Sequence, residues 1–112
     1  MGLTAEEELS LKDAGLIKFF DDNRPAFKAI ATRSYAFAYG YVHDTGLPLR
    51  LDDVAKSLTA ALVPNETLRN YLASKKLRNQ YWYLRFAELI LDRLWKELGD
   101  EHAAIIAPGA ST

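Results

Sequence analysis

The sequence predicts an all-α fold, a single compact domain of about five helices with a helix-turn-helix-like pair in its second half. Three observations carry this prediction. Apolar residues recur at intervals of three and four along most of the chain. Capping residues stand where the helices would begin. The chain of 112 residues is also the size of one domain, which we place at residues 1–102, followed by a flexible tail over residues 103–112.

Two kinds of signal define the first helix. Thr4 and Glu7 form a capping-box pattern, in which each side chain satisfies a backbone amide at the start of a helix. The helix should therefore begin near Ala5. Gly15 is expected to break or bend it, since glycine weakens a helix, and a dense apolar patch then leads to a stop at residues 21–23.

The second helix contains the one segment with strand-like alternation. Pro25 suits the first turn of a helix, which we expect to run to His43. Within it, residues 33–42 read RSYAFAYGYV, which comes close to the base-stacking signature of the RNA-recognition motif but lacks its glycine and its last aromatic residue. On a helix, Tyr35 and Phe37 face nearly opposite sides. We therefore expect a helix that is buried on both sides and lies at the centre of the domain.

Two shorter helices should follow a turn cluster at residues 44–48. The first is predicted over Asp52–Leu62, where apolar residues spaced four apart form one face. Asn65 is a favourable cap for the next, which we expect from Glu66 to about Leu77.

The last predicted helix is the most apolar part of the chain. Asn79 can cap its start and Gly99 its end. Its apolar residues cover more than one face, and the first helix or a second copy of the chain across a twofold axis could cover the surplus. Both possibilities stay open. The residues expected to anchor a partner are Trp82, Phe86 and Trp95.

Charge is distributed unevenly along the chain, although the net charge is only −1. Residues 1–23 carry six acidic residues against two lysines, whereas residues 66–86 carry five basic residues and one glutamate. This basic stretch overlaps the second helix of the helix-turn-helix-like pair, which spans residues 51–78. Arginine and asparagine can read base edges and lysine can neutralise phosphates, so we expect contacts with duplex DNA from Arg69, Asn70, Lys75, Lys76 and Arg78.

Several classes of chemistry lack their motifs. The absence of cysteine excludes disulfides, and the lack of a leader or a long apolar run predicts a cytoplasmic protein without membrane contact. His43 and His102 lack the spacing of a metal site, and the glycines form no phosphate loop. We expect neither a catalytic site nor a cofactor nor a metal.

Two functions follow from these patterns. The first is a small DNA-binding or DNA-associated accessory protein that acts as a homodimer through paired reading helices. The alternative is a non-enzymatic helical protein-protein interaction module, or a subunit of a larger assembly, that holds its partner with the apolar last helix and the acidic amino terminus.

Overall fold

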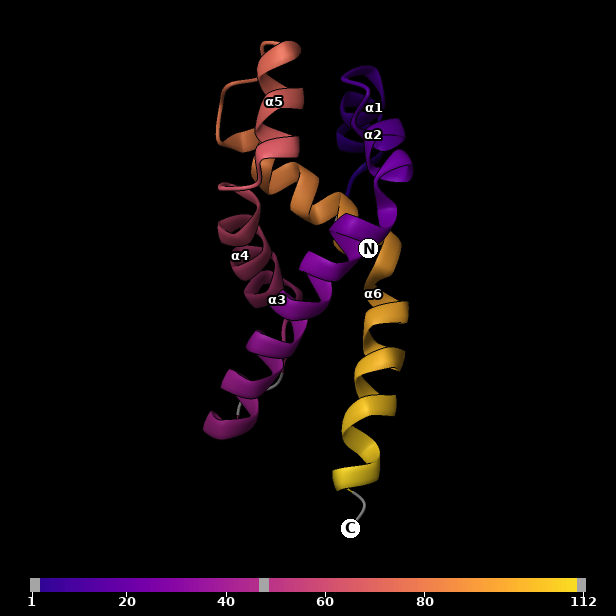
Figure 1. Ribbon diagram of the computed structural model, residues 1–112, viewed down its shortest axis with the longest axis vertical. Coiled ribbons are helices and arrows are strands. Elements are labelled where there is room, and N and C mark those ends of the chain that lie inside the picture. The colour runs from indigo at the N-terminus through magenta and orange to yellow at the C-terminus, as the bar shows by residue number, and fades with distance from the viewer. Residues whose placement is uncertain (1–2, 47–48, 111–112) are drawn as a thin grey trace.

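A computed structural model of the chain describes residues 3–46 and 49–110, with side chains over residues 3–40, 46 and 49–101. The described residues form one helical body with extents of 50 × 23 × 23 Å and contain no strand (Figure 1). The all-α prediction is confirmed, with six helices instead of about five. In chain order they are α1 (Ala5–Asp13), α2 (Leu16–Asp22), α3 (Arg24–Thr45), α4 (Leu51–Leu62), α5 (Glu66–Ser74) and α6 (Tyr81–Ala110).

The amino-terminal segment forms two helices because Gly15 divides it. At the start of α1, the Thr4 hydroxyl accepts a hydrogen bond from the Glu7 amide at 3.1 Å, and the Glu7 carboxylate accepts one from the Thr4 amide at 2.9 Å. The predicted capping box is therefore confirmed. Gly15 has a φ of 76°, in the left-handed region that glycine adopts without steric cost, and α2 begins directly after it.

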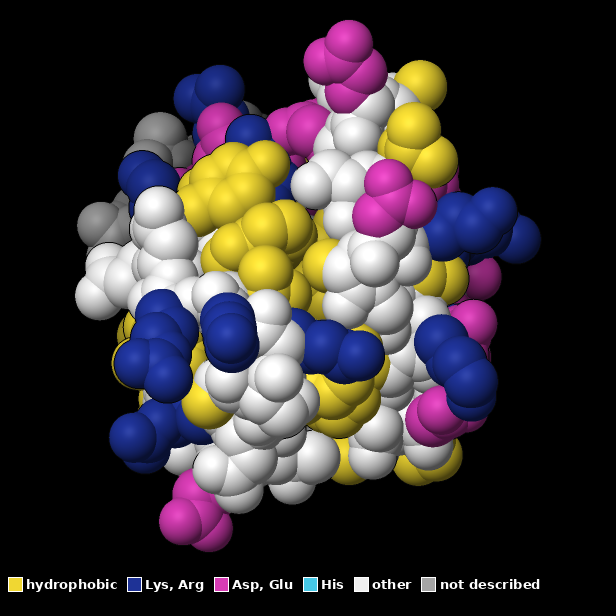
Figure 2. Space-filling view, turned by 90° about the horizontal axis from the view of Figure 1, so that it is seen from above, with side chains coloured by type: hydrophobic (Ala, Val, Ile, Leu, Met, Phe, Trp, Pro, Cys, Tyr) yellow, Lys and Arg dark blue, Asp and Glu magenta, His cyan; other side chains and the backbone are white. Residues whose placement is uncertain are grey.

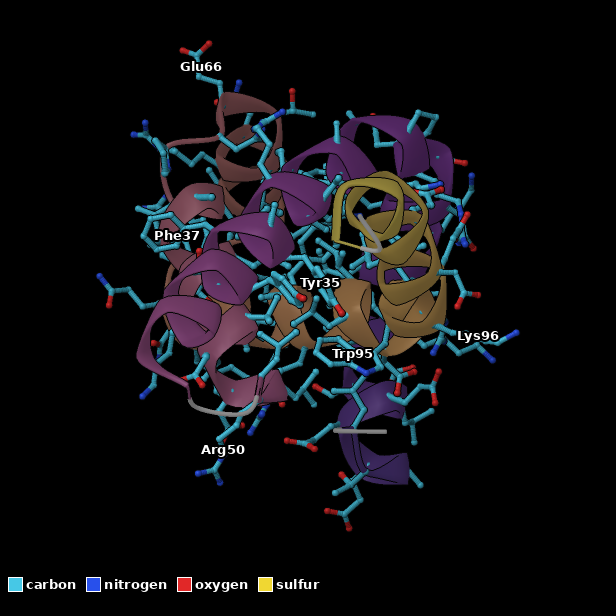
Figure 3. All side chains as sticks on the ribbon, turned by 90° about the horizontal axis from the view of Figure 1, so that it is seen from below. Tyr35, Phe37, Arg50, Glu66, Trp95 and Lys96 are labelled. Atoms are coloured by element: carbon cyan, nitrogen blue, oxygen red, sulfur yellow. The ribbon has the colours of Figure 1, made fainter. Side chains whose placement is uncertain are left out.

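The tyrosine-rich segment at residues 33–42 is helical and belongs to α3. One side of α3 is buried through Phe27, Ala31 and Ala38 and packs against α2, α4 and α6. The expected burial on both sides is wrong for Phe37, whose side chain is 73% exposed and lies at the edge of a hollow beside α4 (Figure 3). The helices that pack on α3 cover this side only in part, so most of the Phe37 side chain stays in contact with water.

The longest helix, α6, lies at the centre of the fold and packs against α1, α2, α3 and α4. The rings of Phe27 and Phe86 meet edge to face at 4.9 Å where α3 and α6 cross. The central position predicted for α3 thus belongs to α6, because α6 supplies a nearly continuous buried row. This row consists of Phe86, Ala87, Leu89, Ile90, Leu91, Leu94 and Leu98.

The predicted end of the last helix at Gly99 is wrong, because α6 continues to Ala110. Lys28 of α3 stabilises the helix on both sides of Gly99. Its ammonium group binds the carboxylates of Glu97 at 2.9 Å and Glu101 at 2.5 Å, which lie on either side of Gly99. These ion pairs favour helical geometry through residue 101. The flexibility predicted for residues 103–112 stays a prediction, and residues 111–112 lie outside the described part.

Helices α4 and α5 are joined by three residues, and the Asn65 side chain caps α5 by accepting a hydrogen bond from the Leu68 amide at 2.9 Å. Figure 1 shows α5 above α4 on the same side of the molecule. The helix-turn-helix-like pair predicted over residues 51–78 is not confirmed by this arrangement. Over residues 3–46 and 49–110, no helix combines the length and the apolar character needed to cross a bilayer.

Candidate nucleic-acid interface

Helix α5 separates its apolar from its polar residues. Leu68 and Leu72 are fully or almost fully buried, and Tyr71 is half-buried, whereas Arg69 and Asn70 are exposed. The Tyr71 ring stacks on Phe19 of α2 with centroids 4.2 Å apart, and the Lys75 ammonium lies 5.8 Å from the Tyr71 centroid. These contacts fix the side of α5 that turns outward, so Arg69 and Asn70 are presented to solvent.

The end of α5 sets the position of the remaining predicted contact residues. The helix ends at Ser74, three residues earlier than predicted, through a Schellman motif. The Leu77 amide donates to the Leu72 carbonyl at 2.8 Å, and Lys76 adopts a φ of 61°. A residue other than glycine in this left-handed conformation costs about 1 kcal/mol. Lys75, Lys76 and Arg78 therefore project from the cap and the following loop and not from a helix.

Arg69, Asn70 and Arg78 come together around a small hollow of about 250 Å³, which is also lined by Leu77 and Tyr83. We call it the arginine hollow. Arg69 reaches it from α5, Arg78 from the loop and Tyr83 from the start of α6. Two guanidinium groups, an amide and a phenol can donate hydrogen bonds to a phosphate or to a base edge.

The cations of this surface differ from those elsewhere in being concentrated in one short stretch. Five other exposed cations of the described residues also make no ion pair, but they are scattered along the chain: Lys12, Arg33, Arg50, Lys56 and Lys96. Lys28 binds Glu97, Arg85 binds Glu7 and Arg93 binds Glu8. In the part of the chain that the structure describes, four basic side chains within ten residues make no ion pair, and all four are exposed. They are Arg69, Lys75, Lys76 and Arg78. Their charge is thus available to an external anion.

Figure 2 views the end of the molecule at which α5 terminates. Lys and Arg side chains are frequent on the left and across the centre of this face, while acidic side chains are more frequent toward the right. Hydrophobic side chains lie between these regions. This end therefore carries a local positive region on a protein whose net charge is −1.

The three residues predicted to anchor a partner occupy different environments. Phe86 is fully buried and contacts Phe27 in the core, so it has no surface to offer a partner. Trp95 is half-buried, with its ring 5.4 Å from that of Tyr35, and Figure 3 shows these two rings facing each other between α3 and α6. Trp82 is also half-buried and lies beside the exposed Leu9.

Trp82 lines a hollow of about 500 Å³ against α1, together with Leu9, Glu6 and Asp13. Leu9 is 57% exposed. Leu9 is not among the partner-binding residues predicted above, although it lies three residues after Glu6 and four before Asp13, the spacing of one helix face.

Known proteins provide no guide to this interface. Comparison of the chain with models of protein families, with curated proteins and with solved structures finds no match. The assignment of a function therefore depends on the chemistry of the described side chains.

Proposed function

We propose that this chain is a small, non-enzymatic DNA-binding or DNA-associated accessory protein that contacts duplex DNA through α5 and the loop after it. The observation that supports this function best is the group of four unpaired, exposed cations at Arg69, Lys75, Lys76 and Arg78. Cations without protein carboxylates nearby can replace the counterions around DNA phosphates, and this exchange drives much of protein–DNA affinity.

The chemistry of the predicted contact residues suggests that some contact bases and others contact phosphates. Arg69 and Asn70 project from the outer face of α5. In this position the arginine can pair with a guanine edge and the asparagine with an adenine edge. Lys75 and Lys76 follow at the end of the helix and suit phosphate contacts. In this proposal, α4 and α5 act as the helix-turn-helix-like pair over residues 51–78, and a homodimer would bring two copies of α5 to two half-sites.

The backbone at Lys76 gives independent support. Glycine is the favoured residue at a left-handed helix end, and lysine at this position costs about 1 kcal/mol in comparison. The side chain adds no ion pair within the described chain that would offset this cost. A gain made by the ammonium group in binding an external anion would account for its presence.

Fluorescence anisotropy with a labelled mixed-sequence duplex of about 20 base pairs tests the proposal at low salt. Lys76→Glu and Arg78→Glu should each weaken binding by on the order of tenfold, because each replaces a phosphate-neutralising charge with a repelling one. Lys96→Glu is the matched control: Lys96 is also exposed, and in Figure 3 it points outward from α6. Equal effects at Lys76 and Lys96, or no duplex binding by the wild type, would remove the proposed function.

The hollow between α1 and Trp82 favours a second candidate, a protein-interaction module. An exposed leucine flanked by Glu6 and Asp13 suits a partner helix that carries apolar and basic residues. If that partner is a second copy, light scattering should give twice the monomer mass of 12.6 kDa, and Leu9→Arg should return the mass to that of a monomer. A wild-type mass of one chain would remove the homodimer.

A further inference from the structure

A second hollow lies next to the arginine hollow, along the flank of α4 and α6. This second hollow has a volume of about 450 Å³, and Lys56, Gln80, Tyr81 and Tyr83 are among the residues that line it. We call it the tyrosine hollow. Tyr83 lines both hollows, so the two are neighbours on this side of the molecule. Together they extend the basic surface from the end of α5 to the exposed side of α4.

The charges along this path are of one sign. Arg69 and Arg78 are the charged residues of the arginine hollow, and Lys56 is the charged residue of the tyrosine hollow. Two neighbouring hollows that share Lys56 contain acidic residues, Asp53 in one and Asp52 and Glu88 in the other. The path itself is therefore electrostatically suited to a polyanion, and acidic residues lie near its Lys56 end.

Aromatic rings lie between the cations. Tyr81 is 40% exposed and Tyr83 is half-buried. The guanidinium of Arg85 lies 4.9 Å from the centroid of the Tyr81 ring, and Arg85 is itself held by Glu7 at 2.6 Å. The Arg85 guanidinium thus packs against the Tyr81 ring and restricts its motion. This restriction reduces the conformational entropy that is lost when a ligand ring stacks on Tyr81.

We propose that the two hollows form a track for single-stranded DNA, in which Arg69, Arg78 and Lys56 contact phosphates and Tyr83 and Tyr81 stack bases. A duplex keeps its base faces inside the helix, so these tyrosines can stack only on unpaired bases. Positive grooves interleaved with aromatic rings are the usual means of binding single strands. This inference rests on the proposed function. It adds a second ligand, a single strand that leaves the duplex and binds along the flank of α4 and α6.

Anisotropy of a labelled oligothymidylate of about 12 nucleotides tests the track, with the duplex measured in parallel. Tyr81→Leu should weaken single-strand binding by about five- to a hundredfold and leave duplex binding nearly unchanged, because loss of the ring removes a stacking platform. Tyr83→Leu should weaken single-strand binding to a similar extent, but Tyr83 also lines the arginine hollow, so duplex binding is compared for Tyr81→Leu alone. Phe37→Leu is the matched control, since Phe37 is an exposed aromatic residue that lines neither hollow, and it lies on the other side of Lys56 in the hollow that contains Asp53. Lys56→Glu provides a second readout that does not disturb a half-buried ring.

The outcomes separate the inference from the proposed function. Duplex binding without oligothymidylate binding, or single-strand binding that Tyr81→Leu and Lys56→Glu leave unchanged, overturns the track while the duplex-binding function stands. Single-strand binding that depends on Tyr81 and Lys56, without duplex binding, supports the track and removes the duplex function. Failure to bind either ligand at low salt overturns both. Circular dichroism of each variant establishes that a loss of binding is not a loss of folding.

Discussion

The Tyr71 hydroxyl of α5 donates a hydrogen bond to the Ala14 carbonyl at 3.1 Å, which links α5 to the turn between α1 and α2. The next residue in that turn is Gly15, where φ is 76°. A β-carbon at Gly15 would overlap the Tyr71 hydroxyl. The position of the proposed DNA-contacting helix therefore depends on a turn more than fifty residues earlier in the chain.

A double-mutant cycle tests this link. Tyr71→Phe should lower the free energy of unfolding by about 1 kcal/mol, because the Ala14 carbonyl loses its partner. Gly15→Ala should cost about 2 kcal/mol or more, through the left-handed backbone and the overlap. Urea unfolding of the double variant should show a cost smaller than the sum, since removal of the hydroxyl relieves the overlap. Strict additivity would contradict the link.

Substitutions at Lys76 separate its charge from its backbone conformation. Lys76→Gly should raise the free energy of unfolding by up to about 1 kcal/mol, because glycine adopts the left-handed conformation without strain. Lys76→Ala should leave stability nearly unchanged, because alanine meets the same strain as lysine. Both variants should bind DNA more weakly than the wild type. A glycine variant no more stable than the alanine variant would argue against a strained Lys76.

The ion pairs between α3 and α6 predict a pH dependence of stability. The hydrogen bond from the Lys28 ammonium, with the charge of Arg24, lowers the pKa of the Glu97 carboxyl below its ordinary value. The folded state thus binds this proton less readily than the unfolded state. The ionised Glu97 carboxylate therefore stabilises the folded state. This stabilisation is fully present above the ordinary carboxyl pKa of about 4.3 and is lost as pH falls through the lower pKa of the folded state.

Glu97→Gln measures this contribution directly. Chemical unfolding between about pH 6 and pH 3 should show a shallower loss of stability for the variant than for the wild type, because glutamine does not titrate. Asp100→Asn is a matched control, since Asp100 is exposed, lies on the same helix and makes no ion pair within the described chain. Parallel pH profiles for wild type and Glu97→Gln would contradict the assigned ion pair.

The contact of Trp95 with Tyr35 distinguishes a structural role from a partner-binding one. Trp95→Ala should lower the free energy of unfolding by about 2–3 kcal/mol, through lost burial and a lost edge-to-face contact. Light scattering should give the same mass for the variant as for the wild type. A change in mass with little change in stability would restore Trp95 as a partner anchor.

The parts of the fold that the sequence predicted are those with local causes. The Thr4 capping box, the Asn65 cap and the break at Gly15 depend on residues a few positions apart, and all occur as expected. The continuation of α6 past Gly99 is accompanied by the ion pairs of Lys28 of α3, a tertiary contact that no local pattern contains. Likewise, the exposure of Phe37 depends on which helices pack on α3.

In the candidate site, too, the features with local causes could be predicted from the sequence and those that depend on tertiary contacts could not. The outward face of α5 could be predicted because Leu68 and Leu72 keep helical spacing, which leaves Arg69 and Asn70 on the other side. The early end of α5 at Ser74 could not, since lysine is unusual at a left-handed helix end. Arg78 and Tyr83 line the same hollow because of the path that an irregular loop takes. The residues of that loop show no periodic pattern, so its path could not be predicted from the sequence.

Salt dependence of duplex binding tests the central claim most directly. If Lys75, Lys76 and Arg78 each neutralise one phosphate, the logarithm of the binding constant should fall with the logarithm of salt concentration with a slope of about −3. Anisotropy titrations at four or more salt concentrations provide this slope. A slope near zero, or no binding at the lowest salt concentration, would contradict the assignment of this surface to DNA.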